Sequence, residues 1–150
     1  SRKPRRNEIN NKDYYFFSVD EFKNKIANNE FVEWEEVYPG SYYGTLKTEL
    51  DRIWKKGKHV IFDVYVVVGL NIKRKFNDQC LSIFIKAPSI AELEKRLRGR
   101  STDSEETIVK RIEKAGHELT FAHRFDLIIV NDNFETAVKQ TYMEIKNFLA

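Results

Sequence analysis

Short apolar runs alternate with longer amphipathic segments along most of this 150-residue chain. The runs that we interpret as buried or half-buried strands are residues 14–17, 31–37, 60–67, 81–85 and 127–130. Strands that are apolar on both faces are typical of parallel sheets covered by helices. The sequence therefore predicts an α/β fold, in which a small β-rich piece precedes a parallel sheet core flanked by helices.

The amphipathic segments carry signals for the start of a helix. Ser18 and Ser89 each begin the four-residue pattern of a capping box. Thr45 is interpreted as the start of a helix that ends at Gly57. Two more helices are expected at residues 104–123 and 133–149. The polar, glycine-containing stretch 98–103 is expected to be a loop, and a mobile lid is its functional interpretation.

Charge and composition limit the partners that the chain can have. The 26 Lys and Arg residues nearly balance 23 Asp and Glu residues. The basic residues gather at residues 2–6 and 95–100, which suits a small polyanion better than a continuous nucleic acid duplex. The single cysteine, Cys80, excludes an intramolecular disulfide. The longest apolar run, residues 60–70, is too short to span a bilayer. We expect a cytoplasmic protein without nucleic acid or membrane partners.

Four residues are candidates for binding a phosphate group. A guanidinium group can grip two phosphate oxygens at once, and a tyrosine hydroxyl adds a neutral donor. The alternative is that the N-terminal arginines are solvated surface charges. The candidates are Arg2, Arg5, Tyr14 and Tyr43.

Glu33 and Thr45 form a candidate site for a purine base. A carboxylate accepts two N–H bonds from the Watson–Crick edge of guanine, and a hydroxyl can donate to its O6. Adenine presents the opposite pattern, so this pair would select guanine. The alternative is that Glu33 faces solvent on a strand and that Thr45 only caps a helix.

Three further residues could act on a phosphoryl group. Arg100 lies on the predicted lid loop and Arg111 on the helix that follows it, and the two could stabilise the charge of a reacting phosphoryl group. Asp63 is interpreted as lying at the end of an apolar strand and could bind Mg²⁺ directly or through water. The alternatives are a basic, solvated helix face for the arginines and a cap or salt bridge for Asp63.

Several motifs, taken in order, resemble those of the guanylate kinases. Residues 2–14 resemble the R-x-P-R-x-x-E…D-Y signature of that family. Further similar stretches are F-V-E-W at 31–34, Y-Y-G-T at 42–45, I-F-D-V at 61–64, the lid stretch 98–111 and I-V-N-D at 129–132. The resemblance covers essentially the whole chain with family-like spacing.

The resemblance implies Mg²⁺-dependent transfer of the γ-phosphoryl group of ATP to GMP. It assigns Arg2, Arg5, Tyr14 and Tyr43 to the GMP phosphate, Glu33 and Thr45 to guanine, and Glu8 to an orienting role. It also assigns Arg100 and Arg111 to the transferring phosphoryl group and Asn131 to the side of the ATP base. The implied architecture is a P-loop-kinase-like core at 48–96 and 112–150, a GMP-binding lobe at 1–47 and a lid at 97–111.

Two departures from the family pattern lead to further expectations. No glycine of this chain begins the phosphate-loop motif G-x-x-x-x-G-K-[ST]. Tyr65 stands where the family has a second aspartate, and Val68 lies at or beside a family glycine. We therefore expect ATP binding only if a phosphate loop is supplied, and no activity from these 150 residues alone. The alternative function is an inactive binding module for a nucleotide or a phosphopeptide. The sheet could be completed by exchange of a strand between the subunits of a homodimer.

Overall fold

The computed structural model describes residues 8–10, 14–99 and 104–150, apart from the side chain of residue 38. The chain forms two compact units, Ser1–Ile72 and Lys73–Ala150, which are described in turn. The N-terminal unit contains α1 (Val19–Ala27), β1 (Phe31–Tyr38), β2 (Ser41–Leu46), α2 (Lys47–Trp54) and the start of α3 (Val66–Phe76). The C-terminal unit contains β3 (Ile83–Lys86), α4 (Ile90–Gly99), α5 (Glu105–Leu119), β4 (Leu127–Val130) and α6 (Phe134–Leu149), with short 3₁₀ helices at Asn77–Gln79 and Ala122–Arg124.

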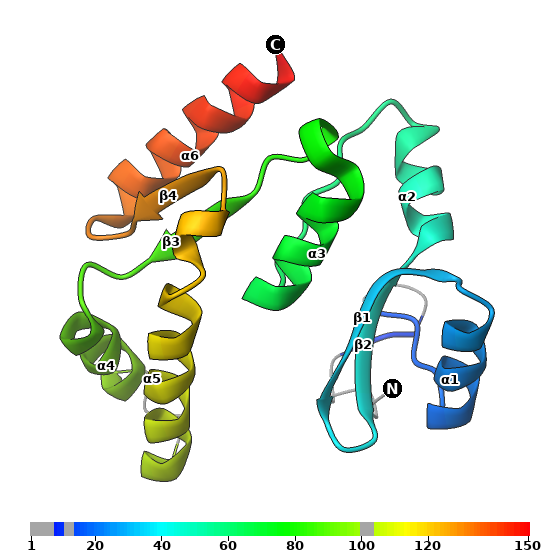
Figure 1. Cartoon of the computed structure of the whole chain (residues 1–150), viewed down its shortest axis with the longest axis horizontal. Coiled ribbons are helices and arrows are strands. Elements are labelled where there is room, and N and C mark those ends of the chain that lie inside the picture. The colour runs from blue at the N-terminus through cyan, green and yellow to red at the C-terminus, as the bar shows by residue number, and fades with distance from the viewer. Residues whose placement is uncertain (1–7, 11–13, 100–103) are drawn as a thin grey trace. The chain divides into compact units, whose positions relative to one another are not determined.

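An antiparallel hairpin of β1 and β2 is the centre of the N-terminal unit (Figure 1). The turn is tight because Gly40 adopts φ +75°, a conformation that glycine accepts at little cost. α1 packs against the hairpin through stacked aromatic rings. The ring centroid of Phe22 lies 4.3 Å from that of Phe31 and 5.5 Å from that of Tyr42. All three side chains are buried, so this aromatic cluster fixes the hairpin onto the helix.

The capping box predicted at Ser18 is confirmed. The Ser18 hydroxyl accepts the backbone N–H of Glu21, and the Glu21 carboxylate accepts the backbone N–H of Ser18. The prediction that Thr45 starts a helix is wrong, because Thr45 lies in β2, opposite Glu33, and α2 begins at Lys47. The β2 strand was missed because a glycine interrupts its short sequence, S-Y-Y-G-T-L, and Thr45 was interpreted as a helix start.

The strand predicted at residues 60–67 is also wrong. Residues 58–65 have no regular secondary structure, and α3 begins at Val66. A buried strand needs a hydrogen-bonded neighbour, and no described strand pairs with this segment. The last two residues of the predicted strand, Val66 and Val67, instead begin α3, whose β-branched residues Val68 and Ile72 are buried. Residues 14–17 likewise form no strand, and only Tyr14 makes an isolated bridge, with Asn10.

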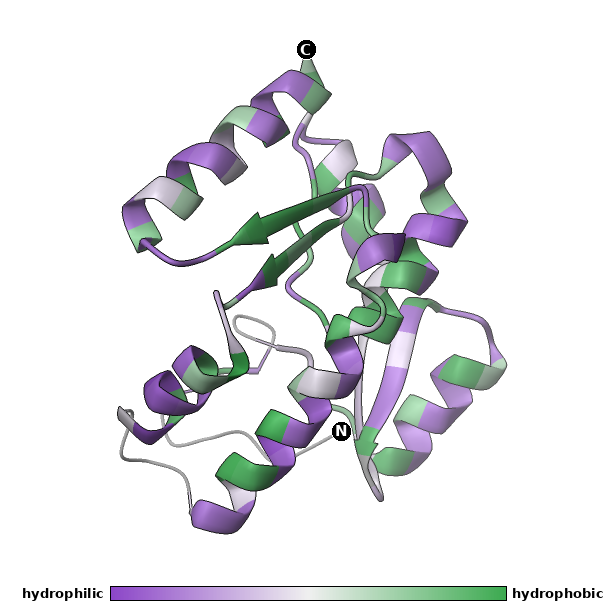
Figure 2. Cartoon of the chain, turned by 60° about the vertical axis from the view of Figure 1, so that its left-hand side comes forward, coloured by the Kyte–Doolittle hydropathy of each residue, from purple (hydrophilic) through white to green (hydrophobic). Residues whose placement is uncertain are grey.

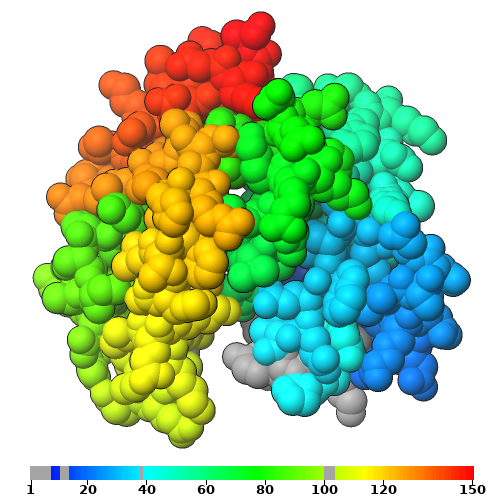
Figure 3. Space-filling model, in the orientation of Figure 1, coloured from blue at the N-terminus to red at the C-terminus, as the bar shows by residue number. Residues whose placement is uncertain are grey.

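The C-terminal unit is built on a parallel pair of strands, as the sequence predicted. β3 pairs with β4 in the register Ile83 to Leu127 through Lys86 to Val130. Both strands are almost entirely hydrophobic, as the green arrows of Figure 2 show. α6 packs against β4, and the side chains of α4 and α5 pack together (Figure 3).

Polar contacts join the starts of the two parallel strands. The Asp126 carboxylate accepts the backbone N–H of Ser82 at 2.8 Å and the Ser82 hydroxyl at 2.7 Å. Lys73 Nζ lies 3.0 Å from the same oxygen. Burial alone would raise the pKa of Asp126, but the bonds from Ser82 and Lys73 outweigh it and lower the pKa. This three-residue clasp of Asp126, Ser82 and Lys73 therefore favours the ionised form of Asp126.

None of the helices in the described part of the chain is long and apolar enough to cross a membrane.

Candidate functional site

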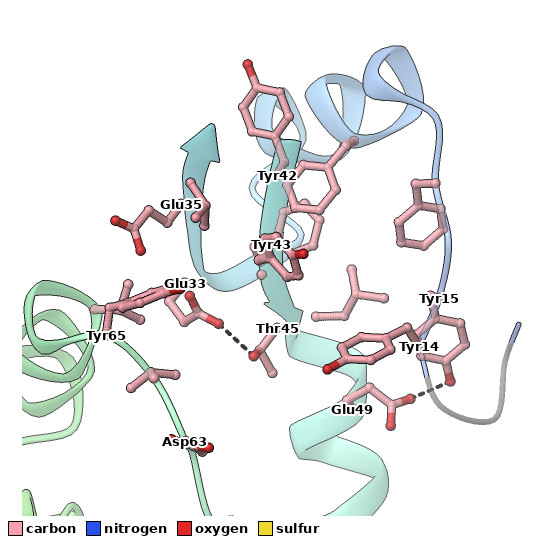
Figure 4. A pocket seen from close by; sticks show the side chains of 18 of the residues that line it. Tyr14, Tyr15, Glu33, Glu35, Tyr42, Tyr43, Thr45, Glu49, Asp63 and Tyr65 are labelled. Atoms are coloured by element: carbon pink, nitrogen blue, oxygen red, sulfur yellow. Dashed lines mark hydrogen bonds between the residues drawn. The ribbon is translucent and has the colours of Figure 1, made fainter. Parts of the chain in front are cut away.

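A pocket of about 890 Å³ lies in the N-terminal unit (Figure 4). Its size is that of a site for a small molecule. The hairpin, α1 with the segment before it, helix α2, the coil before α3 and the first turn of α3 all contribute to it. The polar and titratable side chains that line it are Tyr14, Tyr15, Glu33, Glu35, Tyr42, Tyr43, Thr45, Glu49, Arg52, Asp63 and Tyr65.

The hairpin register explains why four of these side chains gather together. Glu33 is paired with Thr45, and Glu35 is paired with Tyr43. Because side chains alternate between the two faces of a strand, residues two apart on β1 lie on the same face. The intervening Trp34 lies on the opposite face, where its ring centroid is 6.3 Å from that of the buried Tyr42. The hairpin thus presents a polar face to the pocket.

Glu33 and Thr45 are in direct contact. The Thr45 hydroxyl donates to Glu33 Oε1 at 2.7 Å (Figure 4). Burial raises the pKa of Glu33, the bonds from Thr45 oppose that effect, and the nearby Glu35 carboxylate adds to it. Glu33 and Thr45, which were predicted to bind guanine, are therefore neighbours, although the hydroxyl proton of Thr45 points to the Glu33 carboxylate.

Glu35 has an unusual environment within the same pocket. Its Oε2 atom is buried and has no hydrogen-bond partner among the described residues. A buried carboxylate oxygen without a partner is costly, and such groups often belong to binding sites. Glu35 was not predicted from the sequence, although its two-residue spacing from Glu33 on a strand places both side chains on one face.

A second polar cluster joins the segment before α1 to α2. The Tyr15 hydroxyl donates to Glu49 Oε1 at 2.8 Å (Figure 4). Arg52 donates to Glu49 Oε2 from Nε at 2.9 Å and from Nη2 at 2.6 Å. The bond to Glu49 raises the pKa of Tyr15, while Arg52 lowers the pKa of Glu49. This cluster was not predicted from the sequence, where its only signal is the three-residue spacing of Glu49 and Arg52.

The structure locates some of the predicted site residues in this pocket and others elsewhere. Those that line it are Tyr14, Glu33, Tyr43, Thr45 and Asp63. Arg2, Arg5 and Arg100 lie outside the described residues. Glu8 is described but does not line the pocket. Arg111 on α5 and Asn131 after β4 belong to the C-terminal unit.

Asn131 is held by the end of β3 and by α4. Its backbone N–H donates to the carbonyl of Lys86 at 2.8 Å. Its own carbonyl accepts Arg96 Nη1 at 2.7 Å, and Arg96 also donates to Glu92. These contacts fix the backbone directly after β4, where a side chain at a strand end can reach a ligand.

A magnesium site would have to rely on few protein ligands. The described residues contain no group of three His, Cys, Asp or Glu side chains that could hold a metal ion. Asp63 lines the pocket from the coil before α3 (Figure 4). Mg²⁺ commonly keeps several waters and is held by one or two carboxylates together with substrate phosphates, so a single aspartate fits such an ion.

Comparisons with known proteins agree with the motifs. The family model described as guanylate kinase matches residues 1–148. A guanylate kinase of Porphyromonas gingivalis is 53% identical over 150 residues, which are 100% of this chain and 80% of that protein. One from Bacteroides fragilis is 50% identical over 149 residues, covering 99% of this chain and 73% of that protein. The crystal structure of a guanylate kinase from Anaplasma phagocytophilum matches with a TM-score of 0.74 at 27% identity, covering 99% of this chain and 72% of that one. This likeness confirms the predicted fold class.

Proposed function

Because the chain belongs to the guanylate kinase family, we propose that the pocket of its N-terminal unit binds GMP as the acceptor in phosphoryl transfer from ATP. The products of that reaction are ADP and GDP. One observation carries the proposal: Glu33 and Thr45 lie side by side in a pocket of suitable size. A carboxylate accepts from the N1–H and 2-amino groups of guanine, and these donors are absent from the corresponding edge of adenine.

The remaining residues have roles that follow from their chemistry. Tyr14 and Tyr43 line the pocket and would donate to the GMP phosphate together with Arg2 and Arg5. Asp63 would hold Mg²⁺ through water, and the ion would neutralise charge on the phosphates. Arg100 and Arg111 would stabilise the transferring phosphoryl group, and Asn131 would lie near the ATP base. Glu8 would orient the acceptor side, and we place this reaction in the cytoplasm.

A calorimetric titration tests the acceptor site. The protein is titrated with GMP, with AMP and with Mg-ATP, first as wild type and then as Glu33→Gln. We expect GMP to bind better than AMP, and Glu33→Gln to weaken GMP binding about 10- to 100-fold, which corresponds to losing a charge-assisted bond. Equal affinity for GMP and AMP in the wild type would refute guanine recognition.

Glu36→Gln is a matched control for this titration. Glu36 lies on the same strand, but its carboxylate accepts the backbone N–H of Gly40 in the turn and does not line the pocket. Glu36→Gln should therefore leave the preference for GMP unchanged.

A second candidate function is nucleotide binding without turnover. It is favoured by Tyr65, which lines the pocket at the position where the family resemblance expects a carboxylate. A phenol is uncharged near neutral pH and is a poor partner for Mg²⁺. An assay that follows ADP formation with GMP and Mg-ATP separates the two functions, since only a kinase forms ADP in a GMP-dependent way.

A further inference from the structure

Glu35 contributes an unused hydrogen-bond acceptor to the pocket. Its Oε2 is buried without a partner among the described residues, whereas Glu33 Oε1 already accepts the Thr45 hydroxyl. Both glutamates leave β1 on the same face and line the same pocket. An acceptor of this kind is most stable when a ligand supplies an N–H group to it.

One carboxylate that lies in the plane of guanine cannot accept hydrogen bonds from all of its N–H groups. The N1–H and one hydrogen of the 2-amino group can meet the two oxygens of Glu33 side by side. The second hydrogen of the 2-amino group is then left without an acceptor. A buried donor without a partner costs binding free energy, so a pocket that selects guanine gains from a further acceptor beyond Glu33.

The order of residues along the hairpin matches the order of groups on the base. O6, N1–H and the 2-amino group follow one another along the Watson–Crick edge. Thr45 would meet O6 and Glu33 would meet N1–H. Glu35 lies two residues further along β1, about 6.6 Å at the usual rise of a strand. Figure 4 shows it on the side of Glu33 that is distant from Thr45, which is the side where the 2-amino group would lie.

The carboxylates of Glu33 and Glu35 also repel one another. The Glu35 carboxylate adds to the burial that raises the pKa of Glu33, so the two negative charges oppose one another. N–H groups from a bound base would stabilise both charges. Nothing else in the described pocket donates to Glu35 Oε2.

We propose that Glu35 is a second base-recognition residue, which accepts a hydrogen bond from the 2-amino group of GMP. The proposal rests on GMP binding in this pocket. It assigns to Glu35 the discrimination between GMP and inosine monophosphate, a nucleotide that lacks only the 2-amino group. Glu33 would contribute to binding of both nucleotides, because both carry N1–H.

The test is a set of calorimetric titrations with GMP and inosine monophosphate. The proteins are the wild type, Glu35→Ala, Glu35→Gln and the control Glu36→Gln on the opposite face of β1. We expect Glu35→Ala to lower the GMP preference over inosine monophosphate about tenfold or more. Glu35→Gln, which keeps a neutral acceptor, should give an intermediate preference. Glu36→Gln should match the wild type.

The inosine nucleotide also shows whether a variant keeps its fold. Retained affinity for inosine monophosphate with weaker GMP binding supports the proposal. An unchanged GMP preference in Glu35→Ala overturns it, as does an equal loss of affinity for both nucleotides. Failure of the wild type to bind GMP would instead reject the proposed function, and the role of Glu35 with it.

Discussion

At the scale of single residues, Thr45 has one hydroxyl proton and two acceptors that compete for it. In the structure the proton goes to Glu33 Oε1. From the sequence, the same proton is expected to be donated to guanine O6. Since one hydroxyl donates one hydrogen bond, binding of the base requires the Thr45 proton to turn from the carboxylate to O6. The N–H groups of the base would then replace Thr45 as the donors to Glu33.

The raised pKa of Glu33 predicts how GMP binding depends on pH. Only the ionised carboxylate accepts both N–H groups, so GMP affinity should be complete above this pKa and fall as the pH drops through it. The midpoint should lie above the usual value of about 4.3. Titrations between pH 8 and pH 4.5 measure it.

Glu35→Gln is the informative variant for this pH profile. Removing the neighbouring negative charge should lower the pKa of Glu33 and shift the midpoint of GMP affinity to lower pH. Titration of the GMP phosphate is common to both proteins and cancels in the comparison. The other titratable or charged side chains of the pocket are the same in both proteins, so they also cancel in the comparison; they are Tyr14, Tyr15, Tyr42, Tyr43, Glu49, Arg52, Asp63 and Tyr65. Identical midpoints would mean that Glu35 does not act on Glu33.

Gly44 allows the two strands of the hairpin to approach closely. A Cβ atom at this position would lie 2.8 Å from the carbonyl oxygen of Glu33 and 2.9 Å from Cβ of Trp34. Neither atom can move without shifting β1. We expect Gly44→Ala to lower the free energy of unfolding by about 1–3 kcal/mol, as measured by urea denaturation.

Gly116→Ala is the control for this substitution. Gly116 lies exposed inside α5, and a Cβ there meets nothing within 4 Å. Because alanine favours a helix over glycine by about 1 kcal/mol, this variant should be more stable than the wild type. A Gly44→Ala variant that is equally stabilised would contradict the close approach of the strands.

At the scale of helices and strands, local signals predicted some elements and tertiary packing decided others. The Ser18 capping box, the strand at 127–130 and the helix from 133 were correct, because caps and continuous Leu, Ile and Val runs are local signals. Residues 60–67 carry the same kind of apolar run, yet Val66 begins a helix. Whether a strand forms there depends on a neighbouring strand, which the local sequence does not encode.

The same distinction between local signals and tertiary packing applies to the residues of the candidate site. Glu33 and Thr45 were found because a recognisable pattern surrounds them, and the hairpin brings them together across twelve positions. Glu35 and the Tyr15–Glu49 contact had no such pattern. Their relevance appears only when burial and register are known.

The clasp of Asp126, Ser82 and Lys73 belongs to this scale, because it joins the starts of β3 and β4. We expect Asp126→Asn to lower the free energy of unfolding near pH 7 by about 1–3 kcal/mol, since the bonds to Ser82 and Lys73 lose their charge assistance. The pKa of Asp126 is depressed in the folded state. Its contribution is therefore present above the unfolded value of about 3.9 and is lost as the pH falls through the folded value.

Denaturant unfolding of the wild type and Asp126→Asn from pH 7 to pH 3 measures this contribution. The difference in free energy of unfolding between the two proteins should become smaller below about pH 4. Asp78→Asn serves as the control, because Asp78 is exposed in the same unit. A difference that stays constant from pH 7 to pH 3 would show that the charge of Asp126 contributes nothing to stability.

At the scale of the whole molecule, the chain consists of two compact units with the candidate GMP pocket in the first. A ligand at 100 times its Kd stabilises the structure that binds it by about 2.7 kcal/mol. We expect GMP to slow amide hydrogen exchange in the β1–β2 hairpin and to leave the β3–β4 pair unchanged. Equal slowing in both sheets would show that the units open together.

Both tryptophans of the chain, Trp34 in β1 and Trp54 at the end of α2, lie in the first unit. Indole emission therefore originates only from the unit that carries the pocket, and the second unit contributes none. Trp34 stands on the strand between Glu33 and Glu35 and is 46% exposed. Its fluorescence can follow the hairpin as a nucleotide arrives, without a label and without a substitution.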